Sequence, residues 1–187
     1  MKITVTLLLP MVVLLACSSP SEPVKAEPAV NRQQIVERYT TAIWPATSAY
    51  NADHSQGGSA SKQFHAVIEP ILTSSGGGIE AASAYSALRE AAQKLGRMNE
   101  YDTQTQTSHY NDGLHMKNVR VTSVNGNTAT LMVCYTYTDF WYVNIQDTQH
   151  SAAASEATAQ LVKVDNTWYL RAITNDHVVP DCSDSTA

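Results

Sequence analysis

The residue with the clearest chemistry in this chain is Cys17, which follows directly on the apolar run that opens the sequence. Lys2 supplies a positive charge, and residues 3–15 form an apolar stretch with few polar interruptions. A stretch of that length is too short to cross a bilayer, which takes roughly 20 apolar residues. The pattern therefore predicts a secretory signal peptide over residues 1–16, with Cys17 as the first residue of the exported chain.

Ala16 followed by Cys17 resembles the lipobox of bacterial lipoproteins, whose cysteine is lipid-modified on its sulfur before the signal peptide is cleaved. A thiolate suits that reaction because it is the strongest nucleophile among ordinary side chains. The resemblance implies palmitate at Cys17, a lipid-anchored location on the extracytoplasmic face of the cell membrane, and a flexible tether over residues 17–30. The alternative is an ordinary signal peptide followed by an incidental cysteine.

Cys134 and Cys182 are the other two of the three cysteines, so they allow a single pairing. In an oxidising cell envelope such a pair predicts a disulfide bond, which over this span contributes roughly 4 kcal/mol by the loop-closure model. The bond would pin a C-terminal tail, residues 177–187, to the outer face of a strand. A catalytic thiol needs a neighbouring base, of which the spacing gives no sign, and two cysteines cannot fill a structural zinc site.

The six histidines show neither the HxxxH nor the HExxH spacing of a metal site. We therefore expect solvated or locally hydrogen-bonded imidazoles, no metal and no cofactor. The histidines are His54, His65, His109, His115, His150 and His177. Asp139, beside an aromatic cluster, is the one acid to consider as a base in a pocket, although a solvated acid at the end of a strand is the favoured interpretation. With no serine in a GxSxG context either, the sequence predicts no catalytic residue.

Two kinds of element carry these side chains, and the first kind is helical. Residues 31–44 repeat apolar side chains at helical spacing, and Pro45 is expected to end or kink that helix. A short second helix is expected around residues 64–71, where Pro70 should break it, and a third over residues 79–95.

After Gly96 the hydrophobic period changes to two, which is typical of strands. Hairpin turns are expected at Asn125-Gly126 and at Asp165-Asn166, and a loop over residues 151–159. The strands themselves are expected over residues 101–110, 116–124, 128–138, 157–164 and 168–174. Helices followed by an antiparallel meander predict an α+β fold, with three N-terminal helices packed on a curved antiparallel sheet.

The strand over residues 128–138 alternates apolar and polar side chains, as a half-buried antiparallel strand does. Together with Trp141, its apolar face could line a pocket for a small ligand. The other interpretation makes the tyrosines ordinary core residues of a curved sheet, with Trp141 covering its edge. The candidate lining residues on this face are Leu131, Val133, Tyr135 and Tyr137.

The segments TATLMVCYTYTDFWYV and QLVKVDNTWYLRAI resemble the end of nuclear-transport-factor-two-like domains, the fold shared with SnoaL-like polyketide cyclases. More narrowly, the chain is similar to small secreted actinobacterial lipoproteins built on that fold. The resemblance covers residues 31–176, and its sharpest element is the closing hairpin with Asp165-Asn166 in the turn and Trp168 just after it. It implies a cone-shaped domain, in which a strongly bent sheet surrounds a hydrophobic pocket that helices close.

Charge limits the partners that this domain can bind. One of the 12 basic side chains, Lys2, lies in the signal peptide, so 11 remain against 17 acidic ones. An acidic chain without a basic cluster argues against nucleic acid and against electrostatic binding to anionic lipid, so membrane contact should come through the lipid anchor alone.

These observations together predict a membrane-anchored envelope lipoprotein that acts as a non-enzymatic binding or accessory module. Its partner would be a small apolar ligand or another envelope protein. One alternative is a cyclase- or isomerase-type enzyme that uses the cone pocket, as SnoaL-like relatives do. Another is a surface-interference lipoprotein of a mobile genetic element. An acid–base pair converging inside a pocket would favour the enzyme.

Overall fold

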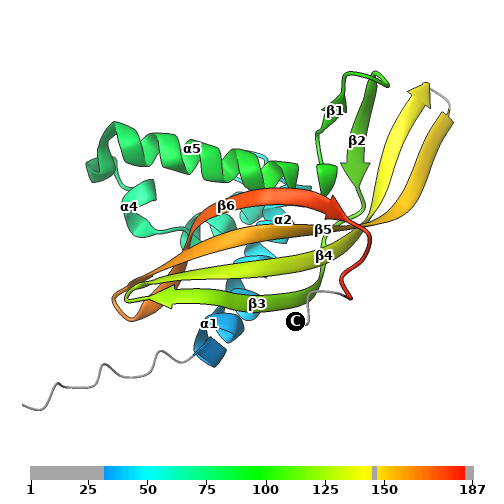
Figure 1. The fold of residues 1–187 in the computed structure, drawn as a ribbon. Helices are drawn as coiled ribbons and strands as arrows, with labels where there is room; N and C mark the ends of the chain where they lie inside the picture. The colour runs from blue at the N-terminus through cyan, green and yellow to red at the C-terminus, as the bar shows by residue number, and fades with distance from the viewer. Residues whose placement is uncertain (1–31, 145–146, 184–187) are drawn as a thin grey trace, which may run out of the picture.

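The computed structural model describes residues 32–144 and 147–183. The predicted signal peptide, Cys17 and the tether over residues 17–30 lie outside the described residues, so acylation stays a prediction. None of the helices in the described part is long and apolar enough to cross a membrane. Within that part, a helical layer is followed along the chain by an antiparallel sheet (Figure 1).

The helical layer precedes every strand in the sequence. Its α-helices are α1 (Arg32–Arg38), α2 (Trp44–Ala52), α3 (Ser59–Val67), α4 (Pro70–Thr73) and α5 (Gly78–Lys94). Shorter turns connect them: η1 (Tyr39–Ile43), a π-helical turn, joins α1 to α2, while the 3-10 turns η2 (Ser75–Gly77) and η3 (Leu95–Arg97) flank α5. The third predicted helix, over residues 79–95, is thereby confirmed.

Pro45 and Pro70 each lie in the first turn of a helix. The first helix does not end near Pro45, because η1 widens the helical turn and the chain continues into α2, with Pro45 in its first turn. A proline is tolerated there because the first N–H groups of a helix have no partner within the helix. Pro70 opens α4, and the predicted break lies directly before it, because α3 ends at Val67 and Ile68 and Glu69 are not helical.

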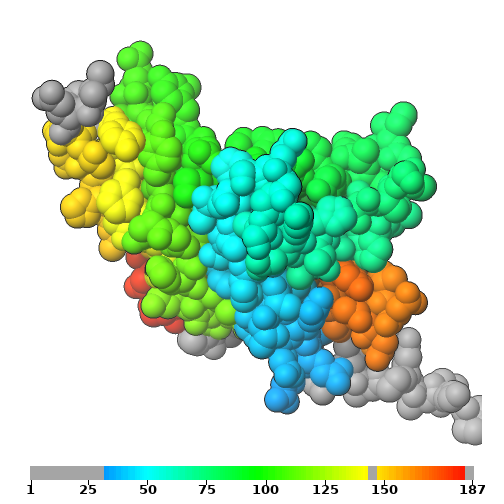
Figure 2. All heavy atoms as spheres, turned by 180° about the vertical axis from the view of Figure 1, so that it is seen from behind, coloured from blue at the N-terminus to red at the C-terminus, as the bar shows by residue number. Residues whose placement is uncertain are grey.

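The sheet has six strands, all paired antiparallel. They are β1 (Tyr101–Asp102), β2 (Thr107–Asn111), β3 (His115–Asn125), β4 (Thr128–Asn144), β5 (Asp147–Val164) and β6 (Thr167–Val179). Their order is β1-β2-β4-β5-β6, and β3 also pairs with β4. The strands curve strongly, and β1, β2 and the ends of β4 and β5 rise together from one end (Figure 1). Seen from behind, the helices cover the middle of the sheet (Figure 2). The predicted α+β fold is confirmed.

Three strand predictions need correction. The strand expected over residues 101–110 is a small hairpin, because the chain turns between β1 and β2, where Gln106 has a φ of 56°. The loop expected over residues 151–159 lies inside β5, where pairing with β4 on one side overrides the low strand propensity of alanine. β6 runs to Val179, so the tail expected from residue 177 begins within a strand.

The inward face of β4 forms the centre of the core. Leu131, Val133 and Tyr135 are 0% exposed and Tyr137 is 3% exposed. The ring of Trp44 from α2 lies 5.2 Å from that of Tyr135. These four side chains are therefore packed in the hydrophobic core, between the sheet and the helices.

On the opposite face of β4, Cys134 lies at disulfide distance from Cys182, with their Cα atoms 5.6 Å apart. The chain beyond β6 folds back to reach it. Cys134 is buried although its strand neighbours Met132 and Thr136 on this face are only half-buried. The segment after β6 is thus tied to the outer face of the sheet.

Candidate functional site

His109 on β2 and Asp139 on β4 form the clearest chemical pair in the described structure. The strands pair so that His109 lies opposite Trp141 and Asn111 lies opposite Asp139, which makes His109 and Asp139 diagonal neighbours on one face. His109 Nδ1 is 3.0 Å from Asp139 Oδ1 and 3.2 Å from Oδ2. The exposed fractions of the two residues are 5% and 4%, so the expectation of a solvated Asp139 is wrong, while His109 is hydrogen-bonded, which is one of the two states expected of the histidines.

Arg97 completes the group from the turn that follows α5. Its guanidinium donates from Nη1 to Asp139 Oδ2 at 3.3 Å and from Nε to Glu100 Oε2 at 2.6 Å. Its Nη2 lies 3.1 Å from His109 Nε2. Because a guanidinium can only donate, Nε2 accepts, and the imidazole proton therefore sits on Nδ1 and is donated to Asp139.

In this arrangement the Nδ1 side of the imidazole faces the Asp139 carboxylate, and the lone pair of Nε2 faces Arg97. Such a tautomer is the one in which a histidine accepts a proton at Nε2 while the carboxylate stabilises the imidazolium that forms. The arginine beside Nε2 is placed to stabilise negative charge that develops on a reacting molecule.

The group opens on a cleft of about 530 Å³, here called the His109 cleft. Its lining includes Arg97, His109, Asp139 and Trp141 together with Asp102, Thr105, Thr107 and Ser151. The Trp141 ring lies 5.9 Å from the imidazole and supplies an apolar wall. On the rim, hydrogen bonds from the backbone of Gln104 and Thr105 hold the pKa of Asp102 below its ordinary value. Trp141, predicted as a pocket residue, is the one member of that set which lines this cleft.

Sequence reasoning missed the pair because 30 residues separate His109 from Asp139, and only the pairing of β2 with the far end of β4 brings them together. One signal was present in the sequence. The inward alternation of β4 through Tyr135 and Tyr137 reaches Asp139 next, so Asp139 had to share their face. The other histidines are exposed or half-buried, and the described residues contain no cluster that could hold a metal ion.

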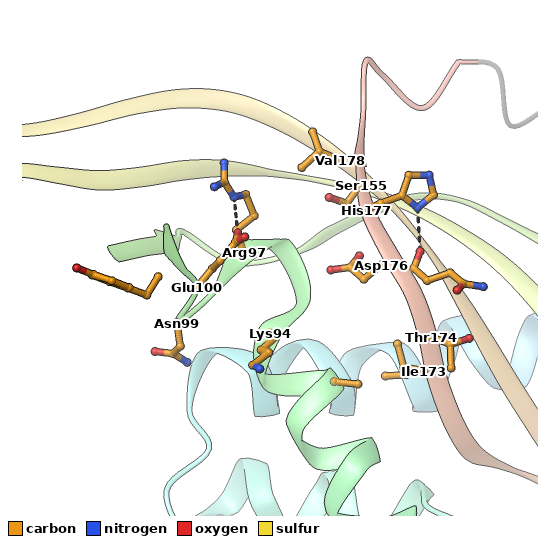
Figure 3. A pocket seen from close by; sticks show the side chains of 13 residues that line it. Lys94, Arg97, Asn99, Glu100, Ser155, Ile173, Thr174, Asp176, His177 and Val178 are labelled. Carbon is orange, nitrogen blue, oxygen red and sulfur yellow. Dashed lines mark hydrogen bonds and ion pairs between the residues drawn. The ribbon is translucent and has the colours of Figure 1, made fainter. Parts of the chain in front are cut away.

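A second and larger cleft, of about 870 Å³, lies against β6 and the end of α5 and is here called the Asp176 cleft. Figure 3 shows the Asp176 carboxylate in the middle of its lining, with Ser155 and His177 on one side and Ile173 on the other. The Tyr135 hydroxyl donates to Asp176 at 2.5 Å, and it accepts from the Gly96 N–H at 3.0 Å. Arg97 lines this cleft as well as the first.

Burial raises the pKa of the Asp176 carboxyl above its ordinary value, and the hydrogen bond from Tyr135 opposes part of that shift. Burial also raises the pKa of Tyr135, so its hydroxyl stays a donor. Tyr137 lies beside it, with its hydroxyl 3.1 Å from the Ser155 hydroxyl. The two predicted pocket tyrosines therefore lie one layer beneath this cleft and touch its lining residues through their hydroxyl groups.

Comparisons with known proteins leave the family open. No protein-family model matches the chain, and no curated protein matches it. Among solved structures, it is similar to a Novosphingobium aromaticivorans protein provisionally described as an aromatic ring hydroxylase, with 12% sequence identity and a TM-score of 0.34. The similarity covers 77% of this chain and 94% of that one. At that score it supports no conclusion about activity, so the function has to be argued from the clefts themselves.

Proposed function

We propose that the protein is an envelope-anchored enzyme that transfers a proton at a carbon atom next to a carbonyl group, as isomerases, cyclases and lyases of the dehydratase type do. The observation that carries the proposal is the buried His109–Asp139 pair, whose imidazole turns Nε2 toward Arg97 in an open cleft. A histidine and an acid that converge in a cleft favour an enzyme over the purely binding role that the sequence analysis preferred.

The geometry supports a specific division of labour. A substrate carbonyl oxygen would replace Nε2 as the acceptor of the Arg97 Nη2 proton, which brings the neighbouring C–H group to His109. The proton then passes to Nε2, and the electron pair of the C–H bond forms the C=C bond of an enolate whose charge rests on oxygen. Arg97 stabilises that oxygen, and Asp139 stabilises the imidazolium. Return of the proton to another carbon completes an isomerisation, and loss of a β-substituent completes an elimination.

The location belongs to the proposal. Acylation at Cys17 and a tether over residues 17–30 would hold the domain on the extracytoplasmic face of the cell membrane. The resemblance to nuclear-transport-factor-two-like domains is in keeping with a small apolar carbonyl compound as substrate, and the Trp141 wall suits an apolar ring or chain.

The test uses a probe that reports any positioned base. The isoxazole ring of 5-nitrobenzisoxazole opens when a base removes the proton on carbon 3: the N–O bond breaks, a nitrile forms, and the phenolate that results absorbs visible light. We expect the full chain to catalyse this opening, and His109→Gln to lower the rate by about a hundredfold or more. Asp139→Asn should also lower it, because the amide favours the other imidazole tautomer.

His115→Gln is the matched control, because His115 is exposed on β3, away from the His109 cleft. It should react like the wild type. Circular dichroism of each variant separates loss of the base from loss of the fold. A rate that is the same in wild type, His109→Gln and His115→Gln would contradict the proposal.

A further inference from the structure

The Asp176 cleft contains a carboxylate with an unusual electrostatic surrounding. Asp176 lies near the end of β6, between lining residues of β5 and α5, and it is bonded to the buried hydroxyl of Tyr135. A hydroxyl satisfies the lone pairs of a carboxylate without neutralising its charge. Asp176 as a residue is exposed to solvent, while its carboxylate accepts a hydrogen bond from a buried hydroxyl, and a positive charge beside such a carboxylate favours its ionised form.

The cationic side chains that line the cleft are engaged elsewhere. Lys94 pairs with Glu90 at 2.6 Å, and Arg97 pairs with Glu100 and with Asp139. Among the described residues, no ion pair within 4.0 Å involves Asp176. Burial raises the pKa of this carboxyl, while the hydrogen bonds from Tyr135 and Gly96 and the nearby His177 oppose part of the rise.

Other residues that line the Asp176 cleft are apolar and could contact the uncharged part of a ligand. Ala91 and Ile173 form one side near α5, and Val178 and Tyr101 stand exposed at the margins. The cleft is large enough for a molecule of several tens of atoms, since small-molecule sites span roughly 300–1,000 Å³. Its floor is negative and its flanks are partly apolar.

We propose that this cleft binds an organic cation, a protonated amine whose ammonium group pairs with Asp176 and whose apolar part lies on Ile173 and Ala91. The site is distinct from the His109–Asp139 pair, and its occupancy does not depend on the reaction proposed there. A cation fits better than an anion because Lys94 and Arg97 pair with acids of their own, and among the described residues the Asp176 carboxylate has no ion-pair partner within 4.0 Å.

The probe is 2-phenylethylammonium, titrated into the full chain by calorimetry at neutral pH. The neutral analogue 2-phenylethanol has the same apolar body without the charge. We expect the ammonium to bind at least about tenfold more tightly than the alcohol, as a charge-assisted hydrogen bond requires. Equal binding of the two would show that apolar contact alone holds the ligand, and it would overturn the proposal.

Asp176→Asn is the decisive variant, because the amide oxygen can still accept from Tyr135 and the shape is kept. It should lose the preference for the ammonium over the alcohol while it stays folded. Asp102→Asn is the matched control, since Asp102 lies in the His109 cleft and not in this one. Loss of the preference in Asp102→Asn, or its persistence in Asp176→Asn, would contradict the assignment.

Acidification gives an independent measurement. Ammonium binding should weaken as Asp176 takes up a proton, and this should begin at a higher pH than for an ordinary aspartate because its pKa is raised. The other titratable groups around it are Tyr135 and Tyr137 on β4, His177 on β6, Lys94 on α5, and Arg97 and Glu100 before β1. His177→Gln should keep the pH dependence, and Asp176→Asn should lose it. If His177→Gln abolishes the pH dependence, the titrating group is the imidazole and the assignment to Asp176 fails.

Discussion

Replacement of Tyr135 by phenylalanine tests the buried network beneath the Asp176 cleft. The substitution keeps the ring against Trp44 and removes only the hydroxyl. That hydroxyl accepts from the Gly96 N–H and donates to Asp176, so Tyr135→Phe removes two hydrogen bonds and creates no cavity of the size of a side chain. The loss of stability can therefore be attributed to polar groups.

The magnitude follows from the two partners. The Gly96 N–H keeps the Asp176 carboxylate as a hydrogen-bond partner, so the main loss is the hydrogen bond from the hydroxyl to that charged group, which contributes about 1.5–3 kcal/mol. We therefore expect Tyr135→Phe to cost about 1.5–3 kcal/mol at neutral pH. The matched control, Tyr137→Phe, loses one bond between neutral hydroxyls, at 3.1 Å from Ser155, and should cost about 1 kcal/mol.

The penalty should also depend on pH, with a definite sign. The pKa of Asp176 is raised in the folded state, so ionisation of this carboxyl group opposes folding. The protonated group contributes to stability at low pH, and that contribution is lost as the pH rises through the pKa of the folded protein. The Tyr135 hydrogen bond lowers this pKa and reduces that loss. Without the hydroxyl the pKa rises further, so the difference between wild type and Tyr135→Phe should be larger at pH 7 than near about pH 4.

Urea unfolding of the wild type and of Tyr135→Phe, each at the higher and the lower pH, measures this difference in the free energy of unfolding. The contributions of the other acidic side chains cancel because these groups titrate alike in the two proteins. A Tyr135→Phe penalty no larger than that of Tyr137→Phe would contradict this account of the buried network. A penalty that is equal at both pH values would separately refute the link to Asp176.

Three further predictions concern covalent and backbone features. Cys17→Ala should leave unprocessed precursor and abolish incorporation of labelled palmitate. If the variant and the wild type partition identically into detergent and neither carries lipid, the proposed lipid anchor at Cys17 is wrong. Cys134 and Cys182 should resist a thiol reagent until reduction, which should also lower the melting temperature; alkylation without reductant contradicts the pairing. Gly96→Ala should destabilise the fold by at least about 1 kcal/mol in urea unfolding, because φ is 61° there and a Cβ atom would lie 2.7 Å from Leu114 Cδ2. Unchanged stability would show that the turn relaxes freely.

Local patterns were sufficient for the elements whose partners are close in sequence. The hairpin at Asp165 and Asn166 is an example, because both residues have positive φ, as the tight turn between β5 and β6 requires. The alternation of β4 likewise identified its buried face. The Ala-rich start of β5 could not be recognised in this way, because small residues have weak strand propensity and only pairing with β4 makes the segment extended.

The candidate site was harder to predict than the fold for a physical reason. Its three members come from β2, from β4 and from the turn after α5, and no spacing rule connects them. β2 pairs with β4 beyond the point where β3 pairs with it, so one long strand serves two partners in succession. That arrangement depends on the length of β4, which runs to Asn144, whereas alternation alone predicted a strand that ends at residue 138.

Gly96 and Arg97 explain why both clefts meet at one turn. Both residues have a φ of 61°, a conformation that is free for glycine and costs an arginine of order 1 kcal/mol or more. The turn sends the Gly96 N–H toward Tyr135, under the Asp176 cleft, and the Arg97 side chain toward Asp139 and His109. The contacts of the guanidinium with Glu100, Asp139 and His109 offset the backbone strain. The position of the charge opposite Nε2 is therefore set by the end of a helix, while the imidazole and carboxylate are set by the sheet, and the chemistry of the site depends on the packing of these two layers.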